Sequence, residues 1–144
     1  MSAWILDTDH VSLLLAGHPQ VSRRVAEVGA DVSITVVTVQ ELFNGWVTRI
    51  NDAKETQDLV RLYGKLNRTI ALCKRVPVAE FNQAAGDRYQ QLLIDTPALS
   101  KRRLQKDMRI AAIALSIGAV IVTRNHRDFS QIPGLLLEDW TQEG

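Results

Sequence analysis

The chain has 144 residues, 46% of them hydrophobic, and a formal net charge of +1 at pH 7. This length is typical of one domain, and the hydrophobic content is enough for a buried core. We therefore expect a single domain over residues 1–144 and exclude an intrinsically disordered chain. The near-zero net charge gives no global signal for nucleic-acid binding, so such a signal must come from local patches of charge.

Cysteine content and hydropathy predict where the protein resides. Cys73 has no partner for an internal disulfide, which is typical of a reducing compartment. The N-terminal residues show no signal-peptide pattern before Asp7. The longest apolar run, residues 110–122, is too short to cross a bilayer and is interrupted by Ser116 and Gly118. We therefore expect a soluble cytoplasmic protein that does not associate with a membrane.

In the first half of the chain, short apolar segments predict strands and longer amphipathic segments predict helices. Strands are expected at residues 3–6 and 32–36. Between them, helices are predicted at residues 11–16 and 19–29. After the second strand, apolar residues spaced by three or four positions predict a helix from residue 38 to about residue 50.

The middle of the chain is mainly helical. Residues 55–74 and 79–94 are predicted as amphipathic helices. Between them, residues 75–78 are expected to form a strand, and Pro77 indicates an edge position because proline cannot donate a backbone hydrogen bond. Residues 95–106 are expected to form an ordered loop or the irregular start of the next helix.

The last third of the chain continues the alternation. Asp107 is expected at the head of an apolar helix that ends at Gly118. A strand follows at residues 119–123, then a polar turn at residues 124–128, and the last strand is expected at residues 135–137. Strands that alternate with helices predict an α/β fold, in which a central, mostly parallel sheet has helices on both faces.

Four carboxylates occupy comparable places in this pattern. Asp7 follows the first strand, and Glu41 lies in the first turn of the helix after the second strand. Asp107 heads the helix before the late strand, and Asp128 follows that strand. Sites in open α/β sheets lie beyond the carboxyl ends of the strands, so we expect the four side chains at one edge of the sheet.

Such a cluster needs neutralisation. At ~5 Å and an effective dielectric constant of ~20, each pair of carboxylates costs roughly 3 kcal/mol. Protons or a divalent cation would relieve this repulsion. Oxygen ligands without histidine or cysteine indicate Mg²⁺ or Mn²⁺.

Each acid also has a purely structural explanation. Asp7 and Asp9 are typical turn residues after a strand, and Asp107 is a favourable N-cap. Residues 38–41 match a capping box, and Asp128 fits a solvated loop. The joint placement at strand ends favours the functional interpretation over these separate explanations.

A series of short motifs covers the chain in order. They are ILDTD at residues 5–9, SIT at 33–35, QELFNG at 40–45, DMRIAA at 107–112, VTRN at 122–125, RDF at 127–129, PGL at 133–135 and EDW at 138–140. In this order they resemble the PIN-domain ribonucleases and, within them, the VapC-type toxins of bacterial toxin–antitoxin pairs. The resemblance implies a PIN-like fold and divalent-metal-dependent cleavage of RNA by a metal-activated water, with Mg²⁺ as the ion and Mn²⁺ as a substitute.

The resemblance also assigns residues to the site. It implies that Asp7 and Asp107 bind the metal and that Glu41 and Asp128 complete the catalytic acids. Supporting polar positions are Thr8, Asp9, Thr123 and Asn125. Asp9 stands where the family commonly has Asn, so it is a candidate further ligand. The fourth acid varies in the family between the positions of Asn125 and Asp128, and both stay open here.

Basic residues are candidates for RNA binding, and the resemblance also implies partners. The candidates for gripping the RNA backbone are Arg102, Arg103, Lys106, Arg109, Arg124 and Arg127. A solvated charged face explains them equally well, and Arg109 has the alternative of pairing with an acid of the cluster. The resemblance implies RNA as substrate, a small cognate antitoxin as partner, and a homodimer or a toxin–antitoxin hetero-oligomer. A possible partner surface is the apolar stripe of Phe43, Trp46, Val47, Leu62 and Tyr63, whose alternative is ordinary helix packing.

Two other functions fit parts of the sequence. Residues 7–11 match the DxDx[TV] start of haloacid-dehalogenase-like phosphatases, in which the first Asp is a nucleophile. Against this, the chain is short for that fold, and Asp87 lies inside a predicted helix. The other alternative is a non-catalytic interaction module whose acidic pocket binds a basic partner.

Overall fold

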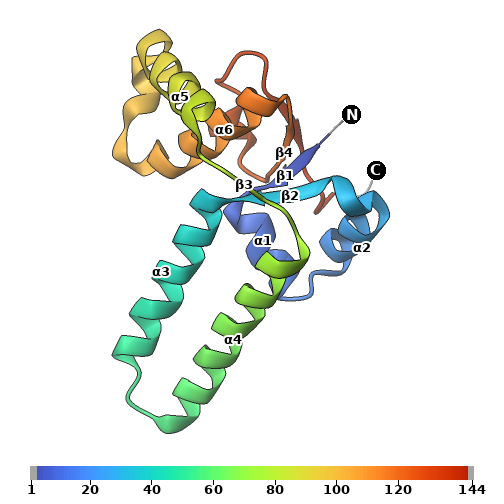
Figure 1. Ribbon diagram of the computed structural model, residues 1–144, viewed down its shortest axis with the longest axis vertical. Helices are drawn as coiled ribbons and strands as arrows, with labels where there is room; N and C mark the ends of the chain where they lie inside the picture. The colour runs from blue at the N-terminus through green and yellow to red at the C-terminus, as the bar shows by residue number, and fades with distance from the viewer. Residues whose placement is uncertain (1–2, 143–144) are drawn as a thin grey trace.

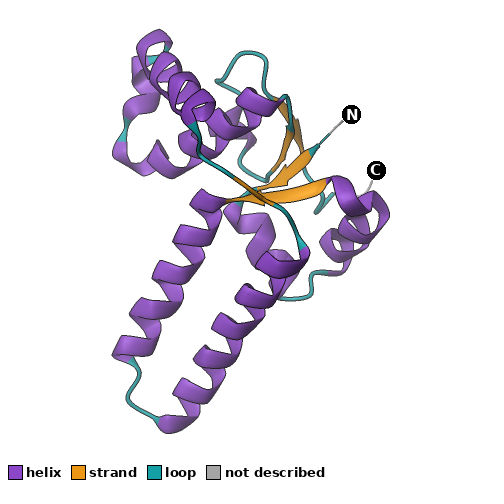
Figure 2. Ribbon diagram, in the orientation of Figure 1, coloured by secondary structure: helices purple, strands orange, loops and turns teal. Residues whose placement is uncertain are grey.

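The computed structural model describes residues 3–142 and contains one five-stranded sheet between layers of helices (Figures 1 and 2). The strand order is β3-β2-β1-β4-β5, and each of the four pairings is parallel. The strands are β1 (Trp4–Leu6), β2 (Val32–Thr35), β3 (Val78–Ala79), β4 (Val120–Val122) and β5 (Leu136–Glu138). The predicted α/β fold, with a central parallel sheet and helices on both faces, is confirmed.

Helices connect successive strands, as parallel pairing requires. They are α1 (Thr8–Leu15), α2 (Pro19–Val28), α3 (Val36–Asp52), α4 (Thr56–Arg75), α5 (Gln83–Asp95), α6 (Gln105–Ile117) and α7 (His126–Phe129). Short 3-10 turns occupy Gly29–Asp31, Pro97–Ser100 and Arg102–Leu104. In the part of the chain that the structure describes, no helix is both long enough and apolar enough to cross a membrane.

Two apolar clusters cover the two faces of the sheet, because successive strand residues point in opposite directions. Ile5 and Ile121 face a cluster shared with α5 and α6. Leu6 and Val122 face a second cluster shared with α1, α2 and α4. In Figure 1, α5 and α6 lie on one side of the strands, and the long α3–α4 hairpin extends from the other side.

The central strands end level with each other. The amide of Asp7 donates to the carbonyl of Val122 at 3.0 Å, and the amide of Thr123 donates to the carbonyl of Glu138 at 2.8 Å. The residues that follow β1 and β4 are therefore adjacent at the carboxyl edge. In the strand order, β3 is the outermost strand on one side of the sheet and pairs only with β2, as Pro77 predicts.

Two predicted helix starts are wrong. Helix α3 begins before Thr38, because the Thr35 hydroxyl accepts a hydrogen bond from the Thr38 amide at 3.1 Å and caps the helix. Residues 38–41 are therefore not a capping box. Helix α6 follows Leu104, which makes no side-chain capping bond, so Asp107 lies inside the first turn and is not the N-cap.

Other boundaries shift by a few residues for local reasons. Helix α1 begins at Thr8, three residues before the predicted start, because Asp7 is its N-cap. Helix α5 begins at Gln83 instead of residue 79, after its own N-cap, Asn82. The predicted polar turn at residues 124–128 contains the start of a short helix, α7.

Candidate active site

Asp7 is held rigidly at the carboxyl end of β1. Its Oδ1 accepts a hydrogen bond from the His10 amide at 2.8 Å and thereby caps α1. The residue is only 5% exposed. Strand pairing fixes the backbone on one side and the helix cap fixes the side chain on the other, so the direction of this carboxylate is set by two secondary-structure elements.

Glu41 reaches the same edge from α3. Its Oε1 accepts a hydrogen bond from the Thr8 hydroxyl at 2.8 Å, and the Thr8 and Thr38 hydroxyl oxygens lie 2.9 Å apart. Thr38 is fully buried. The two threonines thus link the start of α1 to α3 and hold the Glu41 carboxylate next to the Asp7 cap.

Asn125 joins the other two acids. Its Nδ2 donates to Asp107 Oδ2 at 3.3 Å and to Asp128 Oδ2 at 3.1 Å. Its Oδ1 accepts a hydrogen bond from the backbone amide of Asp128 and caps α7. The backbone amide of Asn125 donates to the Thr123 hydroxyl at 2.8 Å. The Asn125 side-chain amide therefore holds the Asp107 and Asp128 carboxylates next to each other.

The charges of the four acids meet at Asp107. Its carboxyl pKa is raised to about 6, first by burial and next by the negative charge of Asp7. The hydrogen bond from Asn125 acts in the opposite direction, and the charges of Glu41 and Asp128 raise the pKa further. The structure therefore brings together the four acids that the sequence placed at one edge. We call Asp7, Glu41, Asp107 and Asp128 the acid cluster.

Two buried polar atoms next to the acid cluster have no hydrogen-bond partner. They are Asp128 Oδ1 and His10 Nδ1. Buried carboxylate oxygens are rarely left unsatisfied, and such an atom commonly marks a place for water or an ion. Asn125 and Arg103 both contact the other oxygen of Asp128, which leaves Oδ1 without a partner.

His10 is a neighbour of Asp7 that sequence analysis did not connect with the site. Its ring is fully buried, Nδ1 lies 3.3 Å from Asp7 Oδ1, and Nε2 accepts a hydrogen bond from the Trp140 amide at 3.3 Å. Nε2 is the acceptor in that bond, and Nδ1 lies next to Asp7 Oδ1 without the geometry of a hydrogen bond. A single histidine beside an acid carries no spacing signal, so only the fold reveals this contact.

Asp9 has a different role from the one expected. Its two oxygens accept hydrogen bonds from Arg124 Nη2 and Nε, both at 2.7 Å. One ligand atom from each of Asp7, Asp9 and His10 lies within 4.8 Å of the others, the geometry of a possible metal group. We consider the acid cluster the better cation site, because Arg124 already neutralises Asp9 and the His10 ring is enclosed in the core.

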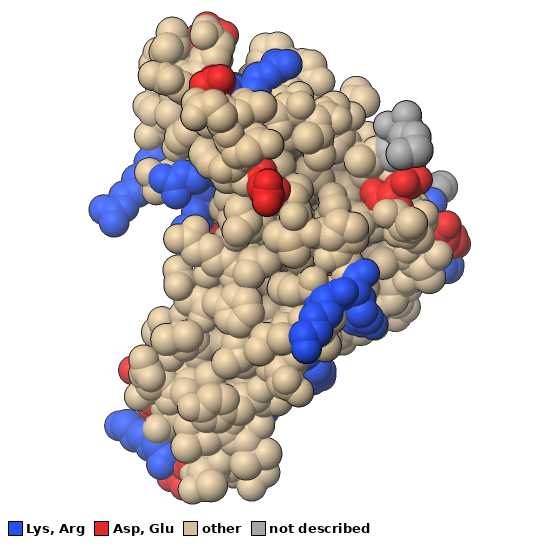
Figure 3. All heavy atoms as spheres, viewed as in Figure 1, with Lys and Arg blue, Asp and Glu red and all other residues tan. Residues whose placement is uncertain are grey.

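The basic candidates divide into two groups. A cavity of about 480 Å³ beside the acids is lined by Glu41, Arg102, Arg103, Gln105, Lys106 and Asp107. Lys and Arg side chains gather there, where the α5–α6 part of the molecule overhangs α3 at the left of Figure 3. Arg103 also forms an ion pair with Asp128 at 3.4 Å.

The remaining candidates lie outside this cavity. Arg124 binds Asp9, and Arg127 is exposed on α7. Arg109 lies 5.7 Å from the centre of the Tyr89 ring, so it stacks on an aromatic residue, and it pairs with no acid among residues 3–142.

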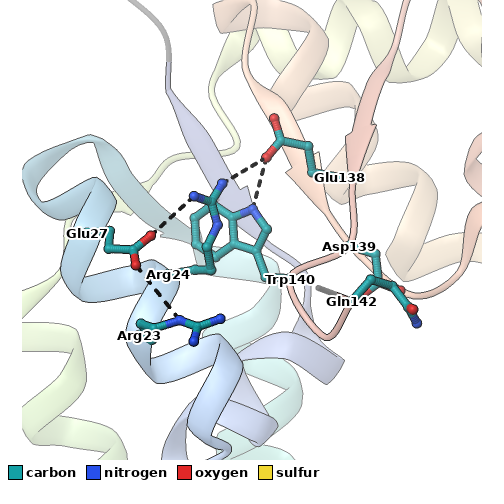
Figure 4. Close-up of a pocket in the computed structure, with 7 residues that line it drawn as sticks. All are labelled: Arg23, Arg24, Glu27, Glu138, Asp139, Trp140 and Gln142. Atoms are coloured by element: carbon teal, nitrogen blue, oxygen red, sulfur yellow. Dashed lines mark hydrogen bonds and ion pairs between the residues drawn. The ribbon is translucent and has the colours of Figure 1, made fainter. Parts of the chain in front are cut away.

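A larger cavity, of about 580 Å³, lies elsewhere, between α2 and the C-terminal segment (Figure 4). There Arg24 lies 5.2 Å from the centre of the Trp140 ring and forms ion pairs with Glu27 and Glu138. These charges satisfy one another, and no member of the acid cluster lines the cavity. Size alone therefore does not identify the candidate site.

The phosphatase alternative gains no support from the fold. Asp87 lies on α5, as predicted, and its carboxylate accepts a hydrogen bond from the Gln83 side chain on the surface. A phosphatase site of that class would need a second acid close to Asp7. The acids of the cluster that contains Asp7 include Glu41 from α3 and Asp107 from α6, and Asp87 is not among them.

Comparison with known proteins gives consistent relatives. No family model matches the chain. The chain is 27% identical over 142 residues to the tRNA(fMet)-specific endonuclease VapC of Shigella flexneri, covering 98% of this chain and 100% of that protein. VapBC-1 from nontypeable Haemophilus influenzae superimposes with a TM-score of 0.78 at 23% identity, covering 97% of this chain and 99% of that one. DNA-bound VapBC from Salmonella typhimurium has the same TM-score and coverage at 25% identity.

The resemblance to the VapC-type PIN-domain toxins is confirmed. Because the similarity runs over nearly the whole VapC-like chain, it includes all four segments that supply the acid cluster.

The raised pKa of Asp107 predicts how metal-free stability depends on pH. The folded state keeps a proton that the unfolded state, with an ordinary pKa, has already lost, so the free energy of unfolding falls as pH rises from about 4 to about 6. The groups that face Asp107 are Asp7, Glu41 and Asp128. We expect Asp107→Asn to remove this part of the dependence, measured by urea unfolding in chelator at pH 4.5 and 7. A stability difference between parent and variant that is the same at both pH values would contradict the prediction.

Proposed function

We propose that the chain is a divalent-metal-dependent endoribonuclease and the toxin of a toxin–antitoxin pair. The observation that carries this proposal is the convergence of four carboxylates at the carboxyl edge of β1 and β4. It is supported by the end-to-end similarity to a protein named as a VapC endonuclease. A non-catalytic acidic pocket would also attract basic partners, but it would not require the two threonines and the asparagine that orient the carboxylates.

The residues present fit a hard divalent cation. The cluster offers carboxylate oxygens alone, and Asp128 Oδ1 is buried without a partner. Asp7 and Asp107 would hold the ion, with Asp128 as a further ligand. When bound, Mg²⁺ supplies Lewis-acid chemistry, lowering the pKa of a water and stabilising negative charge on the phosphate.

The other residues bind and orient. Glu41, held by Thr8, is positioned to accept a proton from the attacking water. Arg102 and Lys106 line the adjoining cavity and would contact RNA phosphates. Arg103 contributes less to RNA binding, because Asp128 partly neutralises it.

Partner binding is proposed from the relatives and from the surface. The solved neighbours include VapBC complexes, which supports a cognate antitoxin and a toxin–antitoxin hetero-oligomer. A homodimer and a cytoplasmic location stay predictions from the resemblance. Of the predicted apolar stripe, Val47 and Tyr63 are 49% and 55% exposed on the α3–α4 hairpin. Leu62 is buried in helix packing and is therefore wrongly included in the stripe.

RNA cleavage tests the proposed function directly. Asn replaces Asp well as an N-cap, so Asp7→Asn should keep α1 while removing a ligand charge. After brief expression, sequencing of RNA ends should show new ends with the parent and none with the variant. The exposed acid Asp31, changed to Asn, is the matched control and should behave as the parent.

The chemistry of those ends tests the mechanism separately. We expect attack by water at phosphorus with the 3′-oxygen as the leaving group, which leaves a 5′-phosphate and a 3′-hydroxyl. Cyclic phosphate ends would instead indicate attack by the RNA 2′-hydroxyl and would overturn the proposed mechanism.

Glu41→Gln separates proton transfer from structure. Thr35 caps α3, and a Gln side chain still offers an oxygen to the Thr8 hydroxyl, so the helix should be unaffected. Metal-free stability should hold or rise because one negative charge is lost. We expect RNA cleavage at fixed Mg²⁺ to fall by about a hundredfold or more, the usual scale for a positioned acid–base group. The control is Glu55→Gln at the start of α4, where the side chain makes no capping bond. Near-parental cleavage by Glu41→Gln would remove Glu41 from the catalytic group.

His10 should tune metal binding through Asp7. In the parent, Mn²⁺ should raise the melting temperature because it binds the folded state only. His10→Phe keeps an aromatic ring but removes the contact with Asp7 Oδ1, so the Mn²⁺ concentration for half of this effect should rise about 10- to 100-fold. His18→Asn, which retains an N-cap on α2, is the control. A lower metal-free melting temperature with an unchanged Mn²⁺ midpoint would limit His10 to support of the fold.

A further inference from the structure

An apolar groove lies beside the acid cluster, on the β2–β3 side of the same carboxyl edge. Its volume is about 480 Å³, and it is lined by Val36, Val37, Gln40, Phe81, Tyr89 and Arg109. Val36 directly follows β2, and Phe81 comes shortly after the end of β3. The strand order therefore sets the acids and the groove side by side, since both lie where parallel strands end.

The groove and the cavity of the acid cluster border each other along two helices. On α3, Val37 lies one turn before Glu41, so both side chains occupy the same helix face. On α6, Lys106 of the acidic cavity lies three residues before Arg109 of the groove. A ligand that extends past Glu41 and Lys106 would reach the groove next.

The walls of the groove are aromatic and open to solvent. Phe81 is 37% exposed and packs edge-on against Tyr89, with ring centres 6.0 Å apart and an interplanar angle of 75°. Val36 is 43% exposed. The guanidinium of Arg109 lies 5.7 Å from the Tyr89 ring centre and, within residues 3–142, has no carboxylate partner. Gln40 adds an exposed amide with both donors and an acceptor.

We propose that this groove binds an unpaired nucleobase of the RNA, next to the phosphate held at the acid cluster; the proposal rests on the proposed function. A base is a flat apolar ring with polar edges, and proteins that recognise single-stranded RNA stack such bases on aromatic and arginine planes. Here Phe81 and Tyr89 supply the apolar surface, and Gln40 and Arg109 contact the base edge. A base inside a duplex is stacked and paired, so the groove selects single-stranded segments.

The test uses the Asp7→Asn protein, which keeps the cap of α1 and lets binding be measured without cleavage. The probe is a fluorescent single-stranded 12-nucleotide RNA, and the same sequence annealed to its complement is the duplex probe. In this background Phe81→Leu retains an apolar side chain but removes the aromatic face. We expect it to weaken single-strand binding about 5- to 100-fold, measured by anisotropy. Ile117→Ala, which shortens an exposed apolar side chain at the far end of α6, should leave binding unchanged.

Kinetics with Asp7 intact give a second readout. Phe81→Leu should raise KM for the single-stranded RNA while kcat changes little, because the acids are untouched. Gln40→Ala should alter which base is preferred beside the cleavage position. Equal binding by parent and Phe81→Leu would overturn the groove proposal. So would a loss of binding that follows a change of oligomeric state in light scattering, since the groove would then be an interface between copies of the chain.

The outcomes separate this inference from the proposed function. RNA that binds in a Phe81-dependent way, but is not cleaved with Asp7 intact, would support the groove and overturn the nuclease. Cleavage that needs Asp7 but not Phe81 would support the nuclease and overturn the groove. Equal binding of duplex and single strand would also overturn the groove as a base site.

Discussion

Repulsion among the four carboxylates is the constraint on which the rest of the site depends. Desolvation and the charge of Asp7 raise the pKa of Asp107 to about 6, which measures how unfavourable the ionised cluster is without a cation. The chain compensates locally in three ways. Thr8 donates a hydrogen bond to Glu41, Asn125 donates to two acids, and Arg103 pairs with Asp128. These contacts reduce the repulsion among the carboxylates but do not give every oxygen a hydrogen-bond partner, and Asp128 Oδ1 has none.

Helix starts provide a second compensation. Asp7 caps α1, Asp107 lies in the first turn of α6, and Asp128 lies in the first turn of α7. Backbone N–H groups at a helix N-terminus carry partial positive charge, so an acid there is stabilised by about 0.3–1 kcal/mol. Three such stabilisations are smaller than the repulsion of roughly 3 kcal/mol for each close pair. The fold therefore positions the acids without fully neutralising them, which supports the proposed binding of a divalent ion.

Sequence reasoning succeeded where one physical rule decides the outcome. Parallel strands end at a common edge. Asp7 and Asp128 follow strands, and Asp107 begins the helix before a strand, which was sufficient to predict that the three side chains lie close together. It failed where two local solutions compete. Both Thr35 and Thr38 are acceptable caps for α3, and Thr38 is buried against Thr8, a contact between residues 30 positions apart. The contacts of Arg124 with Asp9 and of Trp140 with His10 join residues 115 and 130 positions apart, and no spacing pattern encodes them.

The weak overall charge explains why an apolar groove beside the acids is useful. With a formal net charge of +1, the protein has little long-range attraction for RNA, and its acid cluster repels phosphates until a cation is bound. Of the six basic candidates, Arg103 and Arg124 are already paired with acids, which leaves four for contact with the RNA backbone. Base stacking does not depend on charge and is not weakened by the acids next to it. An aromatic groove at the same edge would therefore hold a single strand in register while the cation and the basic wall position the phosphate, so that affinity and catalysis come from different contacts.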